Sequence, residues 1–173
     1  MAVGHLRISF PYRMIILLVL LPALVAEASD QIEQVSVYRS LSVSGTLANG
    51  TQFTLIIELS PYNCSEIRRN DKTEYWGIDR ACPDTTIKKL ELYVDNKLVV
   101  IPKSAYSDLA DVTLPSGVYV MQLGTEVRLY VRGGDGVASY TALILIVGGK
   151  AVSRSIEYLN SEGNLVTSVK RLK

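Results

Sequence analysis

The chain has 173 residues and nearly balanced charge, with 18 lysines and arginines, 17 aspartates and glutamates, and a formal net charge of +1. This balance gives no electrostatic reason to expect nucleic acid, an anionic lipid surface or a highly charged substrate as a partner. The only histidine, His5, lies at the very start of the sequence. Without an imidazole elsewhere, hydrolases of the Ser-His-Asp and Cys-His types and most catalytic zinc sites are excluded.

Residues 1–28 have the pattern of a secretory signal peptide. A basic flank precedes the apolar run MIILLVLLPALV, and Ala26-Glu27-Ala28 places small residues at the cleavage positions. A membrane-spanning helix is the alternative, but such a helix needs about 20 apolar residues, which this run does not reach. We therefore expect residues 29–173 to be exported as a single domain, secreted or periplasmic, without a membrane span.

Two cysteines, Cys64 and Cys82, remain in the exported part. In an oxidising compartment an even number of cysteines predicts a disulfide, which stabilises a loop of this length by about 3 kcal/mol in the chain-entropy model. Two thiols without a histidine are half of a tetrahedral ligand set, so neither a metal nor another cofactor is expected.

Apolar and polar residues alternate in short runs separated by turn residues, and helical periodicity is almost absent. Eight or nine short strands without crossover helices predict an all-β, antiparallel sandwich. The expected strands cover residues 35–47, 53–59, 89–95, 98–102, 118–123, 126–131, 137–147, 151–159 and 165–173.

Turn residues separate these strands. Asn49-Gly50 predicts a hairpin in which both residues take positive φ, and Asp95-Asn96-Lys97 predicts a tight turn. Pro115-Ser116-Gly117 predicts a turn before the strand that starts at residue 118. The stretch KSAYSDLAD, residues 103–111, is the one expected helix, with Ser104 as its N-cap and Asp108 near its start.

Asp135 lies in the stretch VRGGDGVASY, and we interpret it as the centre of a hairpin loop whose side chain accepts hydrogen bonds from neighbouring amides. The alternative is an acidic ion site that also includes Asp108 and Asp111, but the dense Asp-x-Asp-x-Asp pattern typical of calcium loops is missing. A phosphate-binding loop is not expected, because a strand and not a helix follows. The unusual backbone angles of the loop are assigned to Gly133, Gly134 and Gly136.

The polar segment between the second and third expected strands is the first candidate binding surface. Aromatic and arginine side chains dominate protein interfaces, and a disulfide would hold them in place. The alternative is that Trp76, the only tryptophan, folds back to close one end of the sandwich. The candidate residues are Tyr62, Arg68, Arg69, Tyr75 and Trp76.

Two resemblances concern the second half of the chain. Ser116-Gly117-Val118-Tyr119 resembles the Ser-Gly-x-Tyr loop of bacterial periplasmic lysozyme inhibitors, which implies Ser116 and Tyr119 as contacts inserted into a partner. The pair VVIPKSAYSDLADV and RGGDGVASYTALILIVGGKAVSRSIEY is similar to a group of small exported bacterial proteins, many of them uncharacterised. That similarity implies a bacterial exported setting and no particular activity.

These observations lead to one principal hypothesis and two alternatives. The principal hypothesis is an exported, non-enzymatic binding protein that recognises a protein or a cell-envelope component, for example as an inhibitor. The first alternative is a glycan hydrolase that uses two carboxyl groups with separated pKa values. The second is a structural subunit of an envelope assembly, which would show an exposed apolar patch or an unpaired strand edge.

Overall fold

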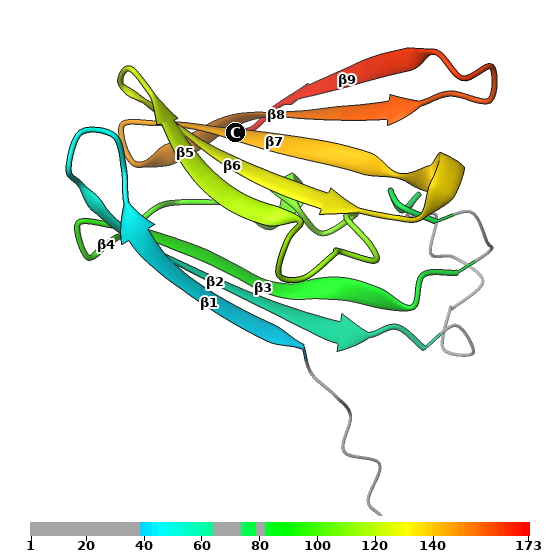
Figure 1. Cartoon of the computed structure of the whole chain (residues 1–173), viewed down its shortest axis with the longest axis horizontal. Coiled ribbons are helices and arrows are strands. Elements are labelled where there is room, and N and C mark those ends of the chain that lie inside the picture. Colours follow the sequence, from blue (N-terminus) through cyan, green and yellow to red (C-terminus); the bar gives the residue numbers. More distant parts are fainter. Residues whose placement is uncertain (1–38, 64–73, 79–81) are drawn as a thin grey trace, which may run out of the picture. The chain divides into compact units, whose positions relative to one another are not determined.

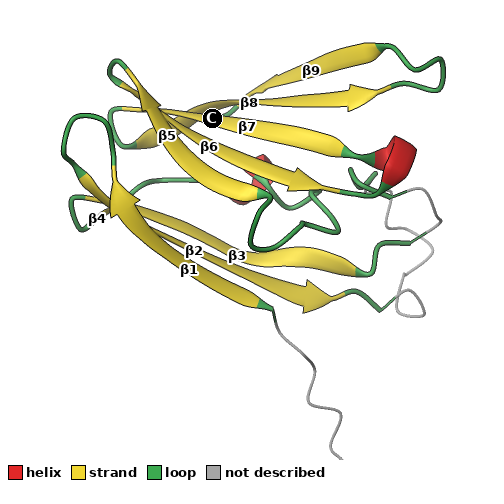
Figure 2. Cartoon of the chain, in the orientation of Figure 1, coloured by secondary structure: helices red, strands yellow, loops and turns green. Residues whose placement is uncertain are grey.

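The computed structural model describes residues 39–63, 74–78 and 82–173. These residues belong to one structural unit, Ser36–Lys173, and form two antiparallel sheets, as predicted (Figures 1 and 2). The predicted signal peptide, Cys64, Arg68 and Arg69 lie outside the described residues, so the signal peptide and the disulfide stay predictions.

The smaller sheet has four strands in the order β1-β2-β3-β4. In β2, every second side chain, Leu55, Ile57 and Leu59, is buried. A bulge between Glu58 and Leu59 shifts the register to β3, so that Ile87 and Leu90 can both face the interior. The strands are β1 (Ser40–Thr46), β2 (Gln52–Pro61), β3 (Thr85–Val94) and β4 (Lys97–Leu98).

The larger sheet has five strands in the order β5-β6-β7-β8-β9. Consecutive strands are paired throughout both sheets, so each sheet is a simple meander (Figure 1). Inner and outer side chains therefore alternate with the pleat in every strand. The strands are β5 (Val118–Leu123), β6 (Glu126–Gly133), β7 (Tyr140–Val147), β8 (Lys150–Leu159) and β9 (Leu165–Arg171).

One hydrophobic core is formed by both sheets and by the segment that connects them, residues 99–117, which we call the connecting segment. Ile57 from β2, Leu129 from β6, Ile144 from β7 and Leu109 from the connecting segment are completely buried. Each such side chain contributes about 1.5–3 kcal/mol by leaving water. Burial of the connecting segment brings Asp108 and Asp111 close to the ends of strands from both sheets.

The helix predicted for residues 103–111 is wrong in extent, because only Lys103–Ala105 forms a single 3₁₀ turn, η2. Ser104 lies inside this turn, and the capping position is taken by Pro102 in an extended conformation. The Asp108 carboxylate accepts hydrogen bonds from Arg154 and caps no helix. Tertiary contacts therefore outweigh the local helical preference of this segment.

Two predicted turns are confirmed. Asp95 and Asn96 have positive φ, 49° and 59°, and Val94 pairs with Lys97 across them, as in a two-residue hairpin. The Pro115-Ser116-Gly117 turn is closed by a hydrogen bond from the Gly117 amide to the Thr113 carbonyl, 2.7 Å.

Two of the expected glycine and asparagine roles are wrong. In the Asn49-Gly50 turn only Gly50 has positive φ, 87°, and Asn49 acts through its side chain, which accepts the Thr51 amide at 3.0 Å. Gly133 does not have the unusual backbone angle expected of it and lies within β6. A glycine is needed there for space, because a Cβ would lie 2.7 Å from the Ala110 carbonyl oxygen.

Within the described ranges, no helix has the length and apolar character needed to span a membrane.

Candidate functional site

The outer faces of the two sheets differ in chemistry. The register of the four-stranded sheet gives it an outer face that is mainly polar, with Ile56, Tyr93 and the 56% exposed Leu98 as its apolar or aromatic members. Its side chains are Ser40, Ser42, Ser44, Thr46, Gln52, Thr54, Ile56, Glu58, Ser60, Thr86, Lys89, Glu91, Tyr93 and Leu98.

The outer face of the five-stranded sheet is rich in apolar and aromatic side chains instead. One row of paired residues crosses all five strands with a single polar member, Ser155, between Leu143 and Val169. Met121 is 44% exposed and Val169 is 68% exposed. We call this set the outer apolar face: Tyr119, Met121, Leu123, Tyr130, Leu143, Leu145, Val147, Leu159, Leu165 and Val169.

An aromatic pair lies at the β5 side of the outer apolar face. The rings of Tyr119 and Tyr130 are stacked, with centroids 4.6 Å apart and planes 9° from parallel. Arg132 donates from Nη2 to the Tyr119 hydroxyl at 3.2 Å, and its guanidinium carbon lies 5.4 Å from the Tyr119 ring centroid. Stacking and the cation–π contact hold the three side chains in one orientation.

Charged side chains surround the outer apolar face. Arg128 is paired with Glu126 at 2.9 Å. Arg132, Arg171 and Glu157 form no ion pair within the described part of the chain. The unpaired charge on this face is therefore predominantly positive.

Of the two residues implied by the lysozyme-inhibitor resemblance, only Ser116 lies in a turn. It is exposed in the turn that leads into β5. Tyr119 lies within β5 and is half-buried against Tyr130. The sequence analysis did not identify Tyr130, Arg132 or Met121 as site residues. Each of them occupies an outward position of a strand in which apolar and polar residues alternate, and this alternation could have identified them.

Trp76 is half-buried and packs against the core, in agreement with the alternative that it closes one end of the sandwich. Its amide donates to the Asp108 carbonyl at 2.8 Å, and its carbonyl accepts from Ala110 at 3.0 Å. Its ring lies 4.9 Å from that of Tyr158, centroid to centroid. Tyr75 makes an edge contact with Tyr62 at 5.3 Å.

A pocket of about 470 Å³ adjoins Trp76. Glu74, Tyr75, Trp76, Asp108 and Arg154 line it. Arg154 binds both carboxylate oxygens of Asp108 through its two terminal nitrogens, one of them at 2.9 Å, and its side chain is 6% exposed against 22% for Asp108. We call these five residues the Trp76 pocket.

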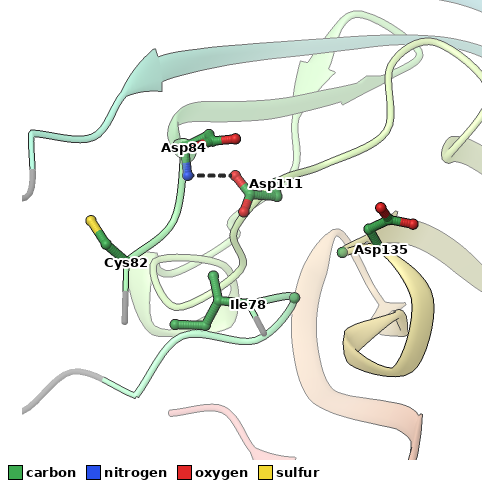
Figure 3. A pocket seen from close by; sticks show the side chains of 7 residues that line it. Ile78, Cys82, Asp84, Asp111 and Asp135 are labelled. Carbon is green, nitrogen blue, oxygen red and sulfur yellow. Dashed lines mark hydrogen bonds between the residues drawn. The ribbon is translucent and has the colours of Figure 1, made fainter. Parts of the chain in front are cut away.

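Three aspartates lie around a second, smaller pocket of about 210 Å³ (Figure 3). Asp111 accepts the amides of Asp84 and Thr85 at 2.9 and 2.8 Å, and Asp135 accepts the Gly136 amide at 2.7 Å. Asp135 thus has the turn role expected of it. Among the residues that the structure describes, no cluster of three or more His, Cys, Asp or Glu could hold a metal ion.

Comparisons with protein families, with characterised proteins and with solved structures find no match to this chain.

Proposed function

We propose that this protein is an exported, non-enzymatic binding protein that recognises a partner protein of the cell envelope through the outer apolar face. The observation that carries the proposal is the contrast between the two sheets, since one outer face is mainly polar and the other presents a larger set of aromatic and aliphatic side chains to water. The predicted signal peptide and the predicted Cys64–Cys82 disulfide support the exported setting.

Covering an apolar face is favourable by about 25 cal/mol for each Å² removed from water. Monomeric proteins rarely leave large contiguous apolar patches exposed, and such patches mark interaction sites. Tyr, Met and Arg are the side chains enriched in protein interfaces, and the Tyr119–Tyr130 stack with Arg132 combines two of these types. The pair is already ordered, so little conformational entropy is lost on binding.

The charges on this face define the chemistry of the partner. Among the described residues, Arg132, Arg171 and Glu157 carry no ion pair, whereas Glu126 is paired with Arg128, so positive charge predominates. A protein surface with an apolar centre and acidic residues at its rim complements this arrangement. Such a partner lies flat on the sheet and does not need to insert a loop or add a strand.

Site-specific photocrosslinking in the native envelope tests the proposal. A photoreactive amino acid at Leu143, in the middle of the outer apolar face, should capture one dominant partner. The same amino acid at Ile56, on the polar sheet, should not. The captured protein is then purified, and its affinity for the wild type is measured by calorimetry.

Substitutions decide whether this face is the interface. Tyr119→Ala should lower the affinity of the purified complex about tenfold or more. Arg132→Glu should also lower the affinity, and its effect should be larger at low salt than at high salt. Tyr93→Ala, on the polar sheet, is the matched control and should leave the affinity unchanged. Equal affinities for Tyr119→Ala, Arg132→Glu and the wild type, or capture of a second copy of this chain at Leu143, would refute the proposal.

A further inference from the structure

We propose that two copies of this chain form a symmetric dimer through their β9 strands. The two strands pair in antiparallel orientation and join the two five-stranded sheets into one continuous sheet. Figure 1 shows β9 at one edge of its sheet, where it pairs with β8 alone. This inference does not rest on the function proposed above, because it depends on backbone groups at the sheet edge and on the charges at the two ends of β9.

Half of the backbone groups of β9 point away from β8. At the two ends of this ladder, the Asn160 amide donates to the Asn164 carbonyl at 2.9 Å, and the Leu172 amide donates to the Val152 carbonyl at 3.0 Å. Alternate residues of an antiparallel strand bond to the same neighbour, so the even-numbered residues of β9 bond to β8. The odd-numbered residues direct their amides and carbonyls to the free edge, where no described residue bonds to them. They are Leu165, Thr167, Val169 and Arg171.

β9 lacks most of the features that protect sheet edges from pairing with other chains. Short strands, prolines and charged side chains are the usual protection. β9 has seven residues without a proline, and its charges are confined to the last two, Lys170 and Arg171. Lys170 points to the inner side of the sheet, where its ammonium donates to the Ser104 carbonyl at 3.2 Å. Residues 165–169 are therefore an uncharged edge, rich in the β-branched side chains that favour strands.

Pairing at this edge also covers apolar side chains. Leu165 and Val169 are 69% and 68% exposed, and both lie on the outer face beside the open backbone groups. An added antiparallel strand places its own side chains about 4.5–5.5 Å from theirs, measured between Cβ atoms. The new strand thus contributes apolar contacts as well as hydrogen bonds.

The charges at the two ends of β9 select a second copy as the added strand. Glu162, in the turn before β9, and Arg171, at its end, are exposed and form no ion pair among the described residues. In an antiparallel pair of identical strands the start of each lies beside the end of the other. Each Glu162 therefore approaches the Arg171 of the other copy. The edge strands β1 and β5 contain no charged residue that would select a partner in this way.

Full overlap of the two strands sets the register. It places Ser168 opposite Ser168 on the symmetry axis and Thr167 opposite Val169 on either side of it. Since the odd-numbered residues bear the open backbone groups, each Thr167–Val169 pair exchanges hydrogen bonds. The Ser168 pair is then non-hydrogen-bonded, with Cα atoms about 4.5 Å apart.

Analytical ultracentrifugation of the exported protein, residues 29–173, tests the dimer. The weight-average sedimentation coefficient should rise from the monomer to the dimer value between micromolar and millimolar concentration. Thr167→Pro removes an amide that does not bond to β8, and it should weaken dimerisation about tenfold or more, because symmetry removes two hydrogen bonds at once. Ser42→Pro removes an open amide from the edge of β1 and is the matched control, which should dimerise like the wild type.

A single cysteine tests the register. Ser168→Cys places two thiols across the symmetry axis at a Cα separation that a disulfide can span. In a glutathione buffer this variant should form a covalent dimer. Ser42→Cys, exposed on the edge strand β1, should remain a monomer. The wild type, with Cys64 and Cys82, gives the background.

Charge reversal tests the choice of a second copy. Arg171→Glu should weaken dimerisation severalfold at low salt, because it brings a carboxylate to the Glu162 of the other copy. Addition of Glu162→Lys to the same chain should restore dimerisation. If Thr167→Pro does not fold, as judged by its urea midpoint, this pair of variants decides the outcome.

Several results would overturn the inference. They are a wild-type sedimentation coefficient that stays at the monomer value, dimerisation of folded Thr167→Pro as strong as that of the wild type, cross-linking of Ser168→Cys no faster than that of Ser42→Cys, or no rescue by Glu162→Lys. Tyr119→Ala should dimerise like the wild type, and Thr167→Pro should bind the captured envelope partner. Failure of the β9 edge and failure of the outer apolar face are therefore distinguishable.

Discussion

At the scale of single residues, Tyr140 shows how the core constrains an ionisable group. Its side chain on the inner face of β7 is buried, and its hydroxyl donates to the Ala110 carbonyl at 3.0 Å. Burial raises the pKa of Tyr140 far above its usual value; Asp111 and Asp108 add to the shift and Arg154 opposes it. Burial therefore favours the neutral phenol in the folded protein.

Tyr140 predicts a loss of stability in alkaline solution. In the unfolded chain its phenol ionises near pH 10, whereas in the folded protein it stays protonated, so the unfolded state gains by releasing a proton. Below pH 10 this contribution is fully present. Above pH 10 it should decline by about 1.4 kcal/mol for each pH unit.

Urea unfolding of the wild type and Tyr140→Phe between pH 8 and 11 measures this effect. The variant should be less stable at pH 8 by about 1–3 kcal/mol, since the Ala110 carbonyl loses its donor. Its free energy of unfolding should then fall less steeply with pH than that of the wild type. Parallel curves for the two proteins would show that Tyr140 is not the group responsible.

At the scale of strands, neighbouring residues of β2 have opposite environments. Ile57 is completely buried, whereas Ile56 points to the polar outer face between Ser42 and Glu91. Ile57→Ala should destabilise the fold by about 2–5 kcal/mol, by transfer and cavity formation. Ile56→Ala should cost less than about 1 kcal/mol. Urea midpoints measure both, and equal costs would mean that the assigned faces of β2 are wrong.

Strands such as β2, β6 and β7 could be predicted because each has one buried face, and a buried face imposes alternation on the sequence. The helix within residues 103–111 was predicted wrongly because its outcome depends on distant partners. Asp108 is drawn to Arg154, which is 46 residues away in the chain. Local propensity contains no information on such a contact.

The candidate sites were predicted only in part, for the same physical reason. Tyr119 was identified from a short loop pattern, but its partner Tyr130 depends on the β5–β6 register. Trp76 was identified from its residue type, yet the pocket beside it combines the connecting segment and β8. Alternation shows which residues share a face within one strand and not which strands are neighbours.

At the scale of the whole molecule, the two sheets differ in the side chains that their outer faces present to water. The four-stranded sheet presents mainly serine, threonine and charged side chains to water. The five-stranded sheet presents the outer apolar face. This difference between the two outer faces is the basis of the one-sided recognition that we propose.

Hydroxyl-radical footprinting of the purified complex tests this account most directly. Partner binding should protect Tyr119, Met121 and Tyr130 from oxidation severalfold, while Tyr93 on the polar sheet reacts as it does in the free protein. Protection of Tyr93 with unchanged reactivity at Tyr119, Met121 and Tyr130 would place the partner on the opposite sheet and contradict the account.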